Sequence, residues 1–257
     1  MKAIIYLIVL FPFLCFGQAI KKNKPNQKLT KYDLLTKSAA IELDKKQYDL
    51  ALNDLNLALE LNPKGDFAYY LKAVLLFESD DKDFKAQLDY IKTAIYLNRL
   101  PESFYYVQRA EIQDSLKNYD EALQDYKLAI LKATQEKGFP KKRLASIYSE
   151  RAHFRVWSVH DNESALYDFN KAIEIDPASY YAFEGRGTVK SMMGDDRGAI
   201  NDYSKAIILN PKESTAYFNR AGCKYSLGDK EGACLDWSKA GELGDMGAYE
   251  SIRKHCQ

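Results

Sequence analysis

A unit of 34 residues is written twice in succession between Ser179 and Gly244. Arg186 recurs as Arg220 and Asp202 recurs as Asp236, in each case 34 residues later. A fixed period of this length is the sequence signature of a stacked repeat architecture. In such a fold each unit contacts only its neighbours, so this period constrains the architecture more strongly than any other feature of the chain.

Small and apolar residues follow a helical pattern from Tyr32 onward. Each unit has a first helix with a small residue on its inner face and a second helix with two more. Small residues at these places let two antiparallel helices approach closely, and larger neighbours fill the layer between hairpins. The first helices carry Ala39, Ala73, Ala110, Ala152, Gly187 and Ala221, and the second helices carry Ala51 and Ala58, Ala122 and Ala129, Ala165 and Ala172, Ala199 and Ala206, and Ala233 and Ala240. We therefore predict an all-α chain of helix hairpins.

This pattern resembles the tetratricopeptide repeat, with its aromatic residue, small residue, short turn, two alanines seven apart and closing proline. The resemblance implies an α-solenoid, a right-handed superhelix of about six hairpins with a C-terminal capping helix. The repeats lie at about 32–65, 66–101, 103–136, 145–178, 179–213 and 214–244, and the cap helix lies at 245–256. The second repeat departs most, because Ala94 sits one place late. The insertion at 134–142 indicates either an extended second helix or a hinge between two halves.

The first residues have the composition of an export signal. Lys2 precedes an apolar run of 14 residues that ends at Phe16, shorter than the roughly 20 residues a membrane-spanning helix needs. We predict a signal peptide over 1–17, cleaved before Gln18. A retained membrane anchor and lipidation at Cys15 are the alternatives.

The segment 18–31 carries five lysines and no acidic residue. It has few residues that could be buried, so we predict a disordered basic leader. With the signal removed, the mature protein is expected to have no stable membrane span and to be exported, either to the periplasm or out of the cell. Such compartments permit disulfides.

A cation on the first helix recurs with an aspartate on the second helix of the same repeat. The two lie at nearly equal distances from the hairpin turn, so antiparallel helices bring them level. The pairs are Lys72 and Asp89, Arg109 and Asp125, Arg151 and Asp168, Arg186 and Asp202, and Arg220 and Asp236. We predict a structural ladder of ion pairs, bidentate where the cation is arginine, because an active site would occur once and not in every repeat.

The cysteines near the C-terminus predict a disulfide. Cys234 lies about ten residues before the turn at Gly244, and Cys256 lies about eleven residues after Asp245. An antiparallel hairpin therefore places them side by side, and a bond would fix the cap helix to the solenoid. The rival bond joins Cys223 to Cys234, and buried reduced thiols are the third possibility.

No motif indicates catalysis, a cofactor or a metal site. The sequence has no glycine-rich phosphate loop and no cysteines and histidines at ligand spacing. The net charge of +1 creates no strong field for nucleic acid or an anionic membrane. We predict a chain that is not an enzyme and that has a protein or peptide partner.

In tetratricopeptide repeat proteins the first helices usually form a concave wall along which partners lie. The resemblance implies a groove here, rich in aromatic side chains that suit a peptide with apolar anchors. Its predicted lining is Phe67, Tyr70, Phe77, Phe104, Val107, His153, Tyr181, Glu184, Phe218, Asn219 and Tyr225, with Trp157 on the same face. Alternatively, several of these residues only fill gaps between adjacent hairpins.

We therefore predict a non-catalytic interaction module or scaffold of the cell envelope that binds a peptide or protein segment in this groove. The alternative is a fixed structural subunit of an envelope assembly or secretion machine, without transient binding in the groove.

Overall fold

The computed structural model describes residues 29–79, 83–98 and 102–256. These residues form thirteen α-helices and one π-helical turn and contain no strand, which confirms the predicted all-α class. The hairpins are α3 (Lys31–Asp44) with α4 (Tyr48–Leu61), α5 (Asp66–Glu78) with α6 (Phe84–Leu97), α7 (Ser103–Ser115) with α8 (Tyr119–Gln135), α9 (Lys141–Phe154) and η1 (Arg155–Val159) with α10 (Asn162–Ile175), α11 (Tyr180–Met192) with α12 (Asp196–Leu209), and α13 (Ser214–Ser226) with α14 (Lys230–Glu242). The last helix is α15 (Met246–His255). None of the helices in the described ranges is both long enough and apolar enough to cross a membrane.

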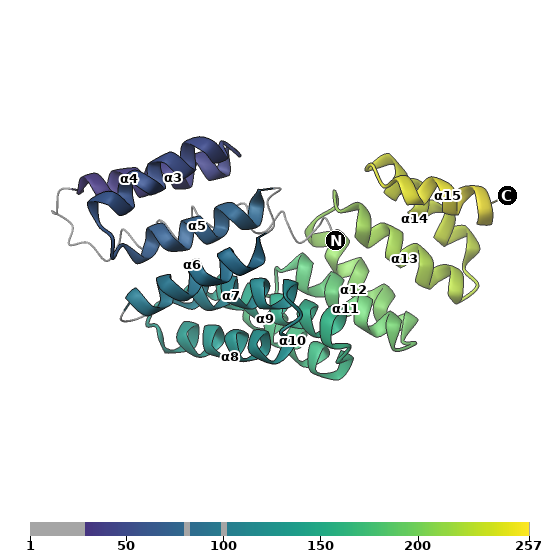
Figure 1. Cartoon of the computed structure of the whole chain (residues 1–257). Helices are drawn as coiled ribbons and strands as arrows, with labels where there is room; N and C mark the ends of the chain where they lie inside the picture. Colours follow the sequence, from purple (N-terminus) through teal and green to yellow (C-terminus); the bar gives the residue numbers. More distant parts are fainter. Residues whose placement is uncertain (1–28, 80–82, 99–101, 257) are drawn as a thin grey trace. The chain divides into compact units, whose positions relative to one another are not determined.

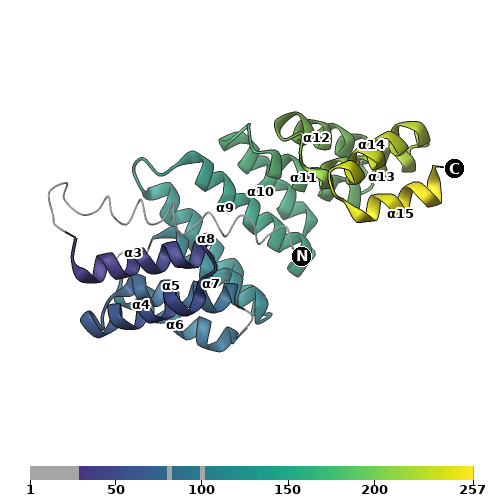
Figure 2. The same ribbon diagram turned by 90° about the horizontal axis from the view of Figure 1, so that it is seen from above.

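Within each part of the chain consecutive helices pack against one another, from α3 to α7 and from α9 to α15, as Figures 1 and 2 show. The chain divides into two compact units, Met1–Lys132 and Ala133–Gln257. We call them the N-terminal unit and the C-terminal unit. The division falls within α8, which has 17 residues and therefore extends further than the other second helices.

The insertion predicted at 134–142 holds the end of α8, a short connection and the start of α9. Gly138 lies in this connection with a φ of 83°, a left-handed conformation that glycine adopts without steric cost. The predicted signal peptide and residues 18–28 of the leader lie outside the described residues. Lys31, placed in the leader, is the first residue of α3, because Thr30 and Asp33 form a capping box.

Helix boundaries follow from capping residues in the sequence. Gly194 and Gly228 end first helices with φ of 86° and 88°. Asp195 and Asp229 then cap the second helices, accepting hydrogen bonds from the backbone N–H groups of Gly198 and Gly232 at 2.9 Å.

The alanines predicted on the inner faces are fully buried, and aromatic side chains fill the space beside them. Phe169, Tyr203 and Trp237 are at most 4% exposed on the second helices of the C-terminal unit. Gly187 shows why the facing position must be small, since an added Cβ would lie 3.0 Å from the Tyr203 ring. The two helices of a hairpin can therefore close on a large ring only where the opposite residue is small.

Four hairpins carry a bidentate arginine–aspartate pair. Arginine Nε and Nη2 donate to the two carboxylate oxygens at 2.8 Å and at 2.6–2.7 Å. The pairs are Arg109–Asp125, Arg151–Asp168, Arg186–Asp202 and Arg220–Asp236. Each guanidinium also lies 5.5–5.7 Å from the centroid of an aromatic ring one turn earlier, namely Tyr106, Tyr148, Phe183 or Tyr217.

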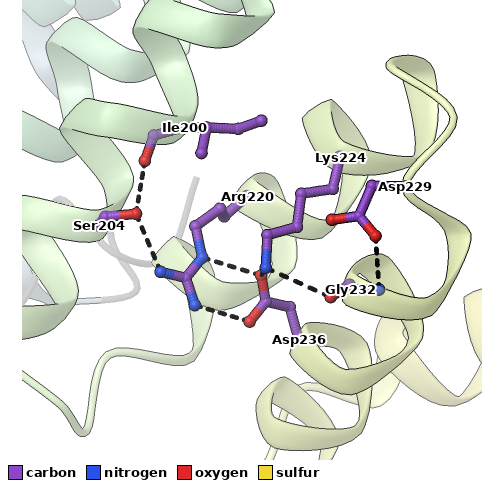
Figure 3. Close-up of polar contacts among 7 residues, drawn as sticks. All are labelled: Ile200, Ser204, Arg220, Lys224, Asp229, Gly232 and Asp236. Atoms are coloured by element: carbon purple, nitrogen blue, oxygen red, sulfur yellow. Dashed lines mark hydrogen bonds and ion pairs between the residues drawn. The ribbon is translucent and has the colours of Figure 1, made fainter.

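The same arginines connect successive hairpins. Arg220 Nη1 donates to Ser204 Oγ at 3.0 Å, and Ser204 belongs to α12 of the preceding hairpin (Figure 3). Lys224, one turn after Arg220, contacts Asp236 Oδ2 at 2.8 Å, the oxygen that also accepts from Arg220 Nε. Arg186 likewise donates to Asn170 on α10. One buried carboxylate therefore organises its own hairpin, and its arginine extends the network to the hairpin before it.

The predicted pairing of Lys72 with Asp89 is wrong. Asp89 is exposed, and within the described residues no ion pair joins it to Lys72. Counted from Ala94, the position that carries aspartate in the other repeats is Tyr90, whose ring centroid lies 5.4 Å from Lys72 Nζ. A shift of one residue turns a side chain by about 100° around the helix, so Asp89 cannot face α5.

Cys234 on α14 and Cys256 after α15 form a disulfide with an S–S distance of 2.00 Å and a Cα–Cα distance of 5.8 Å. Cys223 is a buried free thiol whose Sγ lies 3.3 Å from Ser191 Oγ. Burial raises the pKa of this thiol to about 11, so it is a weak nucleophile near neutral pH. The loop between the bonded cysteines spans 22 residues, and on the chain-entropy model its closure stabilises the fold by roughly 3 kcal/mol.

A thiol titration in denaturant without reductant tests this pairing. We expect one reactive thiol, that of Cys223, in a chain that begins at Gln18, and two in a chain that retains Cys15. Mass spectrometry of the same sample identifies the first residue. Three thiols in a chain that begins at Gln18, or four in the full chain, would contradict the disulfide.

Candidate functional site

The predicted groove residues lie on the first helices, and we call the side of these helices that carries them the first-helix face. In the N-terminal unit the prediction is wrong for Tyr70, Phe104 and Val107, which are only 1%, 3% and 4% exposed. The rings of Tyr70 on α5 and Phe104 on α7 lie 4.9 Å apart, so they fill the space between adjacent hairpins. Phe67 and Phe77 are half-buried against the same core.

His153 on α9 is half-buried and packs against two other rings. Its ring lies 5.0 Å from Phe169 on α10 and 4.6 Å from Tyr181 on α11. Burial lowers the pKa of His153 to about 4, so the imidazole is neutral near pH 7. Its Nε2 is buried and makes no hydrogen bond to the described residues. Sequence periodicity gave the correct face of α9 but not the proximity of α11.

At the C-terminal end, the cap helix covers part of the face. The Tyr225 ring lies 4.5 Å from His255 on α15. A Cβ added at Gly247 would lie 3.7 Å from the Phe218 ring, so this aromatic residue packs beside the first turn of α15. Phe218 and Asn219 are half-buried. The role of Tyr225 is therefore to hold the cap.

Trp157 is the most exposed aromatic residue of the face among those described, with 56% of its surface accessible. It lies on η1, the π-helical turn that extends the first helix of its hairpin. The turn ends at His160, which adopts a left-handed conformation with a φ of 59°. Single π-helical turns inside helices occur frequently at functional sites.

Glu184 on α11 is the charged residue of the face. Burial, followed by repulsion from Glu213 at the start of α13, raises the pKa of its carboxyl to about 7. No ion pair within the described ranges includes Glu184. Tyr180 lies one turn earlier on the same helix, and burial raises the pKa of its hydroxyl. These residues form the candidate site, together with Trp157 and Tyr181.

Among the described residues, no group of three or more His, Cys, Asp or Glu side chains is placed to hold a metal ion. Glu184 and Glu213 supply two carboxylates, and His153 lies beneath the Tyr181 ring with its pKa lowered by burial. Hydrogen bonding, ion pairing and aromatic contact are what such a surface can provide.

The family model of the tetratricopeptide repeat matches residues 105–131, which cover most of the third hairpin. The structure repeats the same hairpin along both units. The third hairpin therefore matches the tetratricopeptide repeat, and the chain has the fold of tetratricopeptide repeat proteins. Proteins of this class are generally non-catalytic interaction modules. The sequence matches no curated protein.

Solved tetratricopeptide repeat structures share the fold at low sequence identity. PilF of Pseudomonas aeruginosa is similar with a TM-score of 0.70 and 13% identity, over 87% of this chain and 97% of that chain. A tetratricopeptide repeat protein from Parabacteroides merdae has a TM-score of 0.60 and 22% identity, over 94% and 90% of the two chains. YrrB, described as having an unusual peptide-binding site, has a TM-score of 0.55 and 16% identity, over 78% and 97%. At these identities the similarity shows the fold alone.

Replacing Glu184 with glutamine should change how stability depends on pH. Because the pKa of Glu184 is raised on folding, the folded chain holds this proton more tightly than the unfolded chain. The free energy of unfolding of the wild type therefore falls as pH rises from the ordinary carboxyl range to about 7, whereas Gln has no proton to lose. We expect Glu184→Gln to gain stability relative to the wild type across this range and then to level off.

Denaturant unfolding of both chains at several values between about pH 5 and pH 8 measures this difference. Burial also raises the pKa of Glu78 to about 7. Both chains contain Glu78, so its contribution cancels in the difference between their free energies of unfolding. If the difference in the free energy of unfolding stayed constant with pH, it would contradict the raised pKa of Glu184.

Proposed function

We propose that the chain is an exported, non-catalytic interaction module that binds a polypeptide segment on the first-helix face of its C-terminal unit. The observation that carries this proposal is the exposed Trp157 on its π-helical turn, next to the hairpin that presents Tyr181 and Glu184. An exposed indole beside half-buried aromatic and polar groups has the composition of a binding hot spot.

The distribution of burial selects the C-terminal unit for this role. In the N-terminal unit the central aromatic residues of the face, Tyr70 and Phe104, contact one another and are closed off from solvent. In the C-terminal unit Trp157, Glu184 and Asn219 retain solvent access. The peptide-binding site described for YrrB, a protein of the same fold, supports a polypeptide as the type of partner.

Two observations support export. The sequence of residues 1–17 has the composition of a signal peptide. The bond between Cys234 and Cys256 is of a kind that persists in oxidising compartments and is rare in the cytosol. We propose a periplasmic or secreted mature chain that begins at Gln18. Mass spectrometry of the protein from its own cells tests this proposal by identifying the N-terminal residue.

Substituting Trp157 tests the proposed face. We expect Trp157→Ala to capture less than about a tenth of the partner that the wild type captures from extracts of the cells that make the protein, because a hot-spot side chain contributes at least about 2 kcal/mol. Tyr167→Ala is the matched control, since Tyr167 is also 56% exposed but lies on the second helix α10.

Quantitative mass spectrometry of the captured proteins provides the measurement. Equal loss with both variants, or no loss with Trp157→Ala, would overturn the proposed face. Unchanged capture would instead favour a fixed structural subunit that is held by other surfaces.

A further inference from the structure

We propose that the partner of the C-terminal unit binds across its hairpin turns and is a polypeptide segment that combines large apolar side chains with lysine or arginine. This inference rests on the proposed function and names the chemistry of the partner. The surface begins at Trp157 and follows the turns between first and second helices, which carry Met192, Met193 and Leu227. We call these four residues the turn edge.

The side chains of the turn edge are large, apolar and 48–56% exposed. They occupy equivalent places in three successive repeats, five or six residues after the small residue of each first helix. Apolar residues scattered singly over a surface are ordinary, whereas a contiguous apolar patch marks a place of interaction. What matters is therefore whether the three turns lie next to one another.

Contacts between the first helices place these turns side by side. Helix α9 packs against α11, and α11 packs against α13. Cys223 Sγ donates to Ser191 Oγ at 3.3 Å, and Val156 and Val189 belong to one buried cluster. Each of these four residues lies within four positions of a residue of the turn edge. Packed helices lie about 8–10 Å apart, so the three turns form one row about 20 Å long.

The N-terminal unit shows that the fold does not require this row. At the same places it has polar residues in five of six cases, and Leu116, the sixth, is half-buried against its own core. The six residues are Asp44 and Lys45, Glu78 and Ser79, and Ser115 and Leu116. Both units build the same hairpin, so the exposed apolar residues of the turn edge depart from the pattern without a gain in packing. Such departures are expected at functional sites.

The residue types and the spacing of the turn edge suit a polypeptide. Tryptophan is enriched among the side chains that contribute most to protein interfaces, and methionine adapts its flexible, polarisable side chain to different apolar partners. Neighbouring turns about 10 Å apart match apolar side chains about three residues apart in an extended segment, or about seven apart in a helix.

Acidic residues predominate beside the turn edge. The segments 158–163, 194–197 and 228–231, which follow its residues, hold six acidic and two basic residues. Glu163 and Glu231 are exposed among them. This excess of negative charge favours a segment that carries lysine or arginine and disfavours an acidic one. It also repels an anionic lipid surface, so a polypeptide fits the turn edge better than a membrane does.

Three labelled synthetic peptides test the proposal on the whole mature chain. In the first, leucine recurs at every third or every seventh position with lysine elsewhere. The second has glutamate in place of lysine, and the third has serine in place of leucine. We expect the first peptide to bind at least about tenfold more tightly than the other two, because only it matches both the apolar row and the charge. Fluorescence anisotropy measures the binding.

Matched variants locate the bound peptide. A chain with both Met192→Ser and Leu227→Ser should bind the first peptide at least about tenfold more weakly than the wild type. A chain with both Ile208→Ser and Leu235→Ser should bind it unchanged, since these side chains are 71% and 67% exposed but lie on the second helices α12 and α14. Circular dichroism shows that each variant is folded.

A second pair of variants tests the charge. Glu163→Gln with Glu231→Gln should lower the preference for the lysine peptide over the glutamate peptide by about twofold to tenfold, the range for two exposed ion pairs. Glu250→Gln, which removes an exposed carboxylate on α15, should keep the preference. An unchanged preference in the first chain, or an equal loss in the second, would overturn the basic character of the partner.

Other results would overturn the turn edge itself. These are equal binding of the three peptides, binding of none of them, or equal weakening by the serine variants of the turn edge and of the second helices. Sedimentation of the chains without peptide examines a further occupant. If the wild type self-associates and Met192→Ser with Leu227→Ser abolishes this association, the turn edge binds another copy of the chain and the proposed partner is wrong.

Capture from cell extracts separates this inference from the proposed function. If Trp157→Ala loses the captured partner while Met192→Ser with Leu227→Ser retains it, the turn edge is wrong and the first-helix face stands. If neither variant loses the partner, both proposals fail.

Discussion

The structure depends on one buried carboxylate in each of the last four hairpins. Asp168 is completely buried, and Asp125, Asp202 and Asp236 are at most 5% exposed, so each needs a cation at hydrogen-bond distance. The arginine of the first helix supplies it through a bidentate contact and rests on an aromatic ring of its own helix. This pair fixes which residues of the two helices lie level. In two hairpins the arginine also contacts the preceding second helix, so the register is passed along the stack.

Repetition also makes departures visible. In the second repeat Tyr90 occupies the position of the aspartate, and Lys72 Nζ lies over its ring. Gln113 replaces the second cation beside Asp125, and the pKa of that aspartate is raised, chiefly by burial. Glu184 introduces a charge where other repeats have none. Lys72 contacts Tyr90 within the chain, whereas no ion pair among the described residues includes Glu184.

The sequence predicted the hairpins well because their signals are local. The alternation of small and large residues and the caps at Asp195 and Asp229 act within one or two turns. The prediction failed at Asp89, where one extra residue rotates the side chain out of the hairpin. It also failed at Tyr70 and Phe104, because periodicity identifies the face of a helix but not the distance to the next hairpin. The absence of a cation at Glu184 could not be predicted, since it depends on side chains that meet only in three dimensions.

The account is tested most directly by the coupling energy between Arg186 and Asp202. A double-mutant cycle with Arg186→Ala and Asp202→Ala, measured by denaturant unfolding, should give a coupling on the order of 1–3 kcal/mol. The same cycle on Lys72 and Asp89, which do not meet, should be additive within about 0.5 kcal/mol. Additive losses at Arg186 and Asp202 would contradict the claim that this pair sets the register of the hairpin.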